Sequence, residues 1–139
     1  MFKNILVPTD LSEKSIKALE IALNMSNKGD RRITFLHIIE RIEDSDEDEL
    51  KSFYDKLASR ARLKMKEMVT PYSDRKVEID NEIIFGNRVG EIVDFAHKHD
   101  IDLIILSSHK LKKADAVEDW ATISYKVGIL APCPVMMVK

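Results

Sequence analysis

The sequence predicts an α/β domain with an open, largely parallel β-sheet and helices on both of its faces. Short apolar segments alternate with helical patterns from one end of the chain to the other. The segments between the apolar runs are long enough to hold helices, and parallel strands require such crossover connections. A chain of 139 residues has the length of one ordinary domain. We therefore expect a single domain over residues 1–139 with the order β-α-β-α-β-α-β-α-β.

Five segments are predicted to be strands. The first is a short apolar run that Pro8 closes, and the second combines β-branched and aromatic residues. The third begins with alternation of apolar and polar residues and finishes apolar, as a strand entering the sheet from an exposed end would. The predicted strands are residues 5–7, 33–39, 77–85, 101–106 and 135–138.

Four helical patterns separate these strands. Ser12 is predicted to cap the first helix, which ends near Gly29, and the second helix stops before Pro71 because proline disfavours helical backbone before it. Seven of the ten residues from 40 to 49 are acidic, which predicts a solvated segment leading into the second helix. The fourth helix is expected over 119–130. The residues expected on the four buried faces are Ile16, Leu19 and Leu23; Leu50, Phe53, Leu57, Ala61, Met65 and Met68; Val89, Ile92, Val93 and Ala96; and Ile123, Val127 and Leu130.

The composition limits the class of protein. There are 24 acidic and 22 basic side chains, so the net charge of −2 gives no reason to expect nucleic acid or a membrane as a partner. The single cysteine, Cys133, excludes an intrachain disulfide and suits a reducing compartment. No signal-peptide pattern and no apolar run of membrane-spanning length is present in the sequence. We expect a cytoplasmic protein.

The segment after the fourth predicted strand is the first candidate for a functional site. Apolar residues end at Leu106, and two hydroxyls, an imidazole and three lysines follow within residues 107–113. In layered α/β domains, ligands bind outside the carboxyl ends of the strands. The lysines are either a clamp for phosphate groups or part of a solvated loop that balances the acidic residues after it.

Four stretches near the ends of the predicted strands occur in a specific combination. They are Ile5-Leu6-Val7-Pro8-Thr9-Asp10, Leu36-His37-Ile38-Ile39, Asp102-Leu103-Ile104-Ile105-Leu106 with Ser108-His109, and Ala131-Pro132-Cys133-Pro134-Val135. In this combination the chain resembles the universal stress protein family. The resemblance implies a three-layer α/β/α fold whose five-stranded parallel sheet has the order 3-2-1-4-5, and commonly a homodimer. In that order Asp10 and the 107–113 loop face each other across the crevice between the first and fourth strands.

The resemblance also implies a ligand. Many members of the family bind ATP, with a proline, a threonine and an aspartate after the first strand and an aliphatic residue of the second strand around the adenosine. Pro8, Thr9, Asp10 and Ile38 match those positions. We expect ATP or another adenine nucleotide, such as ADP or AMP, between the first and fourth strands. From the residues alone, Asp10 is better explained as the end of the first strand and a part of the cap of the first helix.

The phosphate-binding part of the family pattern, G-x-x-G-x9-G-[S/T], is altered in this chain. Ser107, Lys110 and Ala121 stand where glycines let the backbone approach the phosphates. Hydroxyl groups remain at Thr122 and Ser124. The resulting candidate ligand-binding residues are Pro8, Thr9, Asp10, Ile38, Leu106, Ser107, Ser108, His109, Lys110, Thr122 and Ser124.

Two functions therefore remain open at this point. One is a stress-response or regulatory module that binds an adenine nucleotide. The alternative is a nucleotide-free homodimer of the same family that acts through protein contacts. No nucleophile-elbow or P-loop pattern is present in the sequence, so we expect no dedicated catalysis, while weak ATP hydrolysis remains open. We expect no metal site either, because no cluster of carboxylates or cysteines accompanies His97 and His99.

The last predicted strand is a candidate dimer interface. In the implied strand order it lies at an edge of the sheet, and residues 135–138 carry neither charge nor proline. Such an edge leaves unpaired backbone groups beside apolar side chains, which favours pairing with another strand. We expect a homodimer joined through residues 134–138 about a two-fold axis.

Overall fold

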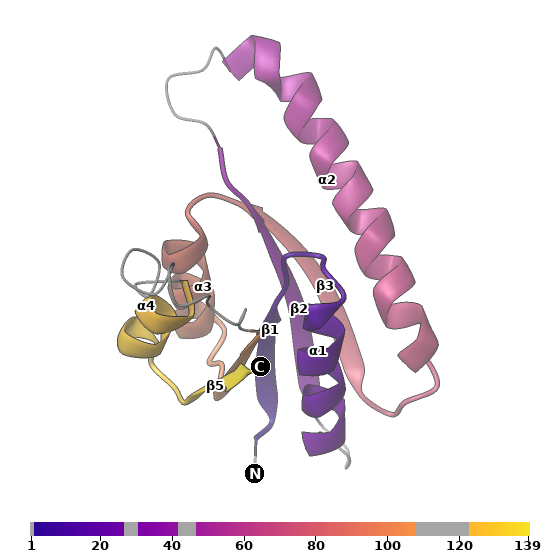
Figure 1. The fold of residues 1–139 in the computed structure, drawn as a ribbon, viewed down its shortest axis with the longest axis vertical. Helices are drawn as coiled ribbons and strands as arrows, with labels where there is room; N and C mark the ends of the chain where they lie inside the picture. Colours follow the sequence, from indigo (N-terminus) through magenta and orange to yellow (C-terminus); the bar gives the residue numbers. More distant parts are fainter. Residues whose placement is uncertain (1, 27–30, 42–46, 108–122) are drawn as a thin grey trace.

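The computed structural model describes residues 2–26, 31–41, 47–107 and 123–139. Its helices and strands alternate along the chain, as predicted (Figure 1). In order, they are β1 Asn4–Pro8, α1 Lys14–Met25, β2 Arg32–Ile39, α2 Glu47–Val69, the short 3₁₀ helix η1 Thr70–Tyr72, β3 Glu78–Phe85, α3 Arg88–Lys98, β4 Leu103–Ser107, α4 Ile123–Leu130 and β5 Val135–Val138.

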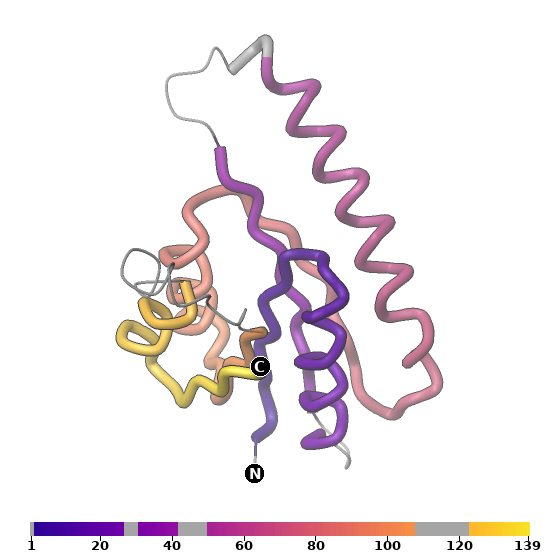
Figure 2. The backbone as a smooth tube through the Cα atoms, viewed as in Figure 1, coloured from indigo at the N-terminus to yellow at the C-terminus, as the bar shows by residue number. Residues whose placement is uncertain are grey.

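The five strands form one parallel sheet in the order β3-β2-β1-β4-β5, which confirms the order implied by the resemblance. The strand β1 lies in the centre, where Leu6 pairs with Thr34 of β2 on one side and with Ile104 of β4 on the other. The trace in Figure 2 shows the chain moving outward from β1 through β2 to β3, and then crossing to β4 and β5. The strand order reverses between β1 and β4, so the crevice expected at that point has the predicted flanking strands.

Helices cover both faces of the sheet, with α1 and α2 on one side and α3 and α4 on the other (Figure 1). Because successive strand residues point to opposite faces, each strand contributes to two separate cores. Val7 and Phe35 belong to the core under α1 and α2, whereas Leu6 and Leu36 belong to the core under α3. Both cores are continuous across the central strands, so the sheet supports the turns at the ends of its strands.

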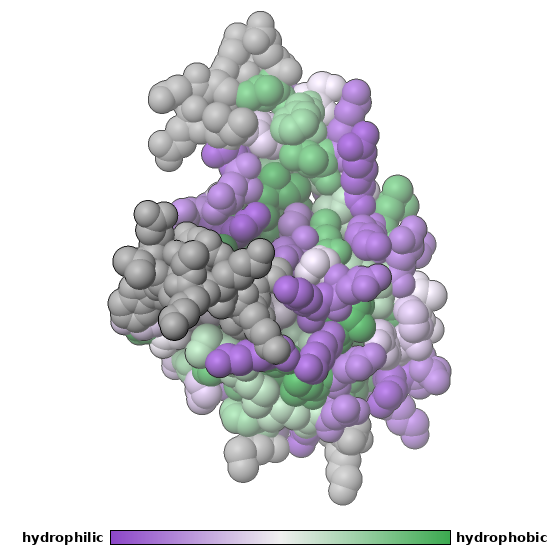
Figure 3. Space-filling model, viewed as in Figure 1, coloured by the Kyte–Doolittle hydropathy of each residue, from purple (hydrophilic) through white to green (hydrophobic). Residues whose placement is uncertain are grey.

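The predicted buried face of α2 is wrong at its amino-terminal part. Ala61, Met65 and Met68 are buried as expected, but Phe53 is 49% exposed. The reason is length: 23 helical residues span about 35 Å, whereas the eight residues of β2 or β3 span about 26 Å. The helix therefore extends past the sheet, and Figure 3 shows apolar surface along its upper part.

Two other predicted faces differ in detail. Phe95 of α3 is buried, and Val93, which was expected there, is half-buried. In α4 only Val127 is buried, and Leu130 is 57% exposed, so the prediction for Leu130 is wrong. The helix α4 has eight residues and packs against α3 and β5, which leaves its last turn outside the core.

The prediction that Ser12 caps the first helix is also wrong. The helix α1 begins at Lys14 with Glu13 at the cap position and no side-chain cap bond, and it ends at Met25, before the expected Gly29. Ser12 instead belongs to the turn that precedes the helix, where the Ser12 N–H donates to the Asp10 carboxylate. The second helix ends at Val69, before Pro71, as predicted.

Candidate functional site

Thr9 anchors the turn after β1 through hydrogen bonds of its backbone and its side chain. Its side chain is 7% exposed, and its backbone N–H donates to the carbonyl oxygen of Leu36 at 2.8 Å. The Thr9 hydroxyl accepts from the Leu11 N–H at 2.9 Å and lies 2.6 Å from the Ser15 hydroxyl, which in turn donates to the Ser12 carbonyl oxygen. Because the Ser15 proton is used in that bond, the Thr9 hydroxyl donates to Ser15. The Thr9 side chain therefore joins the turn to the start of α1.

His37 adds a contact that sequence analysis did not identify. Its Nδ1 lies 2.8 Å from the carbonyl oxygen of Thr9, and a carbonyl oxygen can only accept, so Nδ1 is the donor. The side chain is half-buried near the carboxyl end of β2. The sequence signal was a histidine within a mostly apolar strand, and the acceptor is a backbone atom 28 positions away.

Asp10 closes a local turn next to Thr9. Its Oδ1 accepts from the Ser12 N–H at 2.9 Å and from the Ser12 hydroxyl at 2.5 Å, while the side chain stays exposed. Leu11, between them, has a φ of 69°, in the left-handed region that a leucine adopts only at a cost. The turn is thus an Asx turn in which Asp10 is both a structural acceptor and a carboxylate open to solvent.

Three buried apolar residues flank this turn on one face of the sheet. Pro8 and Leu106 each lie two residues beyond the paired residues Leu6 and Ile104, and Ile38 lies two residues beyond Leu36, which pairs with Pro8. The two-residue period of a strand puts all three on the face of the α3 and α4 core. Together, Pro8, Ile38 and Leu106 form an apolar wall.

The structure thus brings together six of the predicted site residues at the carboxyl ends of three adjacent strands. These are Pro8, Thr9, Asp10, Ile38, Leu106 and the half-buried Ser107. Ser124 is half-buried in the first turn of α4. The remaining predicted site residues lie outside the described residues, and they are Ser108, His109, Lys110 and Thr122.

The nucleophile and metal chemistry of the described residues is limited. Burial, followed by the nearby Asp102 carboxylate, raises the pKa of the Cys133 thiol, which keeps it in the less reactive protonated form. No group of three or more His, Cys, Asp or Glu side chains within the described ranges could hold a metal ion. His99 instead stacks on Phe95 with ring centroids 4.1 Å apart.

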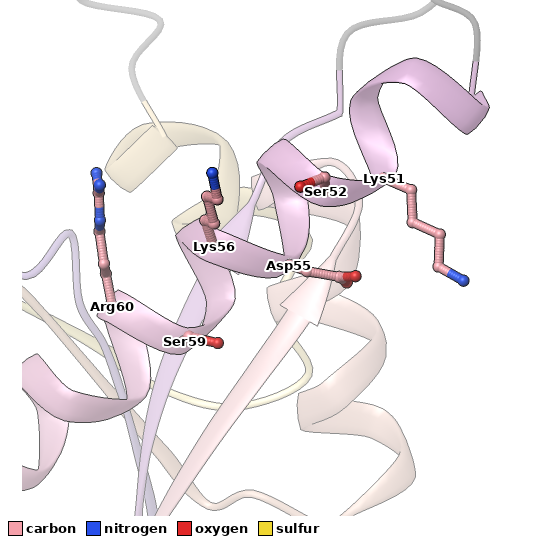
Figure 4. Close-up of a pocket in the computed structure, with 6 residues that line it drawn as sticks. All are labelled: Lys51, Ser52, Asp55, Lys56, Ser59 and Arg60. Carbon is pink, nitrogen blue, oxygen red and sulfur yellow. The ribbon is translucent and has the colours of Figure 1, made fainter.

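Two surface hollows lie away from this site. One is lined by residues of α2 alone, and Figure 4 shows their side chains spreading outward from the single helix. The other lies at the opposite end of the strands, beside the amino ends of β1, β2 and β3. Their lining residues are Lys51, Ser52, Asp55, Lys56, Ser59 and Arg60 for the first, and Lys3, Asn4, Arg31, Arg32, Lys76 and Glu78 for the second. Neither hollow includes a residue of the apolar wall.

The fold and the site define a class of protein. An open parallel sheet whose strand order reverses beside a turn with an exposed carboxylate is a doubly wound α/β domain, and such domains bind ligands at the reversal. Within the described part of the chain, no helix has the length and apolar character needed to cross a membrane.

The chain belongs to the universal stress protein family, because the family's sequence model, "Universal stress protein family", matches residues 1–139. It is 24% identical to universal stress protein MJ0531 of Methanocaldococcus jannaschii over 145 aligned positions, which cover 100% of this chain and 83% of that protein. It is also similar to the solved structure of universal stress protein UspA from Lactobacillus plantarum, with 25% identity, a TM-score of 0.82 and coverage of 99% and 98% of the two chains. A family protein from Arabidopsis thaliana, solved with AMP bound, has 20% identity, a TM-score of 0.71 and coverage of 99% and 91%.

Proposed function

We propose that this protein is a regulatory module that binds an adenine nucleotide at the carboxyl ends of β1, β2 and β4. The observation that carries the proposal is the apolar wall beside the exposed carboxylate of Asp10, at the reversal of the strand order. A purine ring needs apolar surface, and a ribose needs a hydrogen-bond acceptor, so the two features suit the two parts of adenosine. The AMP bound to the relative from Arabidopsis thaliana supports the choice of an adenine nucleotide.

In the adenosine half of the site, some residues contact the ligand and others hold the turn in place. Pro8, Ile38 and Leu106 cover one face of the base, and the Asp10 carboxylate accepts from a ribose hydroxyl. The single hydroxyl proton of Thr9 is used inside the protein, so Thr9 serves the site mainly by fixing the turn. Ser107, the last residue of β4, supplies a hydroxyl at the point where the ribose and phosphates would continue.

The phosphate half rests on residues between β4 and α4 and on the start of α4. Ser108, His109, Lys110 and Thr122 lie outside the described residues, and Ser124 is in the first turn of α4. Lysines are good point-charge partners for phosphate, but they do not offer the close backbone approach of glycine. We therefore propose weaker binding of ATP than in relatives with the glycines, with no dedicated hydrolysis.

Two measurements test the proposal: an assay for nucleotide that co-purifies with the protein, and a titration of the stripped protein with nucleotides. Freshly purified protein is denatured, and the supernatant is assayed for nucleotide; stripped protein is then titrated with ATP, AMP, adenosine and, as a control, GTP. We expect an adenine compound in the supernatant or saturable binding of the adenine ligands in preference to GTP. Absence of both would favour the nucleotide-free alternative, which the missing glycines support.

The oligomeric state is the second part of the proposal. We propose a homodimer in which β5 pairs with β5 of a second copy about a two-fold axis. The strand lies at the edge of the sheet, and Met137 on it is 53% exposed. Exposed apolar side chains of α4, namely Tyr125, Ile129 and Leu130, add apolar surface beyond that strand. A cytoplasmic location and a single domain over residues 1–139 complete this proposal.

The dimer is tested with one proline. Because the Ile104 N–H bonds to the Pro134 carbonyl oxygen, the backbone groups of Met136 face β4 and those of Met137 face outward. Met137→Pro therefore removes an outward N–H from the edge strand and obstructs pairing, so it should give monomers that keep their helix content. Exposed Lys139→Pro, one residue past β5, is a control that should leave the dimer intact. Light scattering at micromolar concentration measures the mass. A monomeric wild type, or a dimeric Met137→Pro variant, would contradict an interface at β5.

A further inference from the structure

We propose that His37 is a positioning residue for nucleotide binding, which acts by fixing the peptide group between Thr9 and Asp10. The inference rests on the proposed function for its effect on affinity. It assigns His37 no contact with the ligand. The nearest residue of the apolar wall on the same strand is Ile38, and neighbouring residues of a strand point to opposite faces.

The turn after β1 needs support because part of it is strained. Leu11 has a φ of 69°, and a left-handed conformation costs a non-glycine residue about 1–2 kcal/mol. The bonds of Asp10 to Ser12 are local, so they shape the turn without tying it to the sheet. The Thr9 hydroxyl joins the turn to Ser15 of α1, Leu11 packs against the core, and hydrogen bonds from β2 add a link to the sheet.

Two hydrogen bonds from β2 tie the turn to the sheet, and both involve the backbone of Thr9. Its N–H donates to the Leu36 carbonyl oxygen, and its carbonyl oxygen accepts from His37 Nδ1, each at 2.8 Å. The first bond continues the backbone pairing of the strands, whereas the second comes from a side chain. The carbonyl of Thr9 belongs to the same planar group as the N–H of Asp10. The His37 bond therefore restricts rotation of the plane that aims the Asp10 side chain.

Two substitutions distinguish a hydrogen-bonding role of the His37 side chain from a role in packing alone. The donor is Nδ1, the ring nitrogen nearer the backbone. An asparagine amide reaches about as far as Nδ1, so His37→Asn can keep the bond, whereas His37→Leu keeps apolar bulk and removes it. A residue that only filled space would tolerate leucine at least as well as asparagine.

The affinity arm compares wild type, His37→Leu and His37→Asn in titrations with adenosine and ATP. For His37→Leu we expect a loss of about fivefold to tenfold, the effect of one hydrogen bond, equal for the two ligands because the adenosine half is what shifts. The Asn variant should recover most of the wild-type affinity. Loss in both variants, or a loss confined to ATP, would overturn the positioning role.

A ligand-free arm keeps this inference separate from the proposed function. The Leu11 N–H donates to Thr9, so its hydrogen exchange reports whether the turn stays closed. We expect faster exchange at Leu11 in His37→Leu, wild-type exchange in His37→Asn, and unchanged exchange in core strands. If the wild type bound no adenine compound, the proposed function would fail while this arm still decided the role of His37. Unchanged exchange at Leu11 in His37→Leu would refute that role.

Discussion

The substitution Asp10→Ala separates the structural role of this residue from its proposed contact with a ligand. In the structure Asp10 accepts two hydrogen bonds from Ser12, one from the backbone N–H and one from the hydroxyl. Side-chain acceptors of this kind contribute about 0.5–2 kcal/mol when they hold a turn or a helix start. The side chain is exposed, so water replaces the lost acceptor and no buried donor is stranded. We expect a loss near the lower end, about 1 kcal/mol.

That loss leaves the domain folded. Domains of this size are stable by about 5–15 kcal/mol, and 1 kcal/mol lowers the melting temperature by about 3–5 °C. The assay is thermal unfolding in parallel with titration of adenosine. Asp10→Asn is the matched control, because its amide oxygen can still accept from the Ser12 N–H while the negative charge is gone.

The expected pattern differs between the two properties. Asp10→Asn should keep most of the wild-type stability yet lose affinity, because hydrogen bonds to a charged acceptor are about twice as strong as neutral ones. Asp10→Ala should lose both. The reasoning is refuted if adenosine binds equally well to all three proteins, or if the melting temperature of Asp10→Ala falls by more than about 10 °C, which would make the residue structural.

Three further predictions address other parts of the molecule. Replacing the three lysines of the 107–113 loop with alanine should weaken ATP more than adenosine, since only ATP has phosphates; equal losses would exclude the phosphate clamp. Met65→Ala should cost about 2–5 kcal/mol in urea unfolding, whereas Phe53→Ala should cost less than about 1 kcal/mol; similar costs would contradict the overhang of α2. Burial and then the hydrogen bond to Glu20 raise the pKa of Tyr72 from 10.0 to about 12, so its contribution to stability should be complete below pH 10 and disappear as the pH rises through 12. Tyr72→Phe should lack that pH dependence, and an unchanged dependence would assign it to another group.

The sheet was predictable because its strands are marked locally. Most of the strands are apolar runs between polar or proline-containing segments, and β3 begins with alternating apolar and polar residues. The helices between the strands force parallel pairing. The strand order itself came from the resemblance, since apolar runs do not reveal which strands are neighbours. The helix faces were predictable only where the helix lies over the sheet. Phe53 has the spacing of a buried residue, but the helix outruns the strands that would cover it.

The site was predictable where a residue type and its position agree. Pro8, Asp10 and Ile38 match family positions at strand ends, and the structure places them at the carboxyl ends of adjacent strands, while their contact with a ligand stays a prediction. His37 lies in one of the stretches that carry the resemblance, but its contact was missed because the partner is a backbone carbonyl in the turn after β1, which no sequence pattern encodes. Ser12 was assigned as the helix cap because it is a good cap residue, yet its hydroxyl and its N–H both donate to Asp10 in an earlier turn. Competition between two local hydrogen-bonding arrangements cannot be resolved from residue types alone.

The central claim is that an adenine nucleotide binds beside the turn after β1. The most direct test is a titration of isotope-labelled protein with adenosine, then with ATP, followed through backbone amide chemical shifts. We predict that adenosine shifts the amides of Asp10, Leu11, Ile38 and Ser107 together with one affinity, and that ATP extends the shifts into the loop after β4. Chemical-shift changes confined to α2 or to the amino ends of the strands would contradict the account. So would the absence of any change at millimolar ligand.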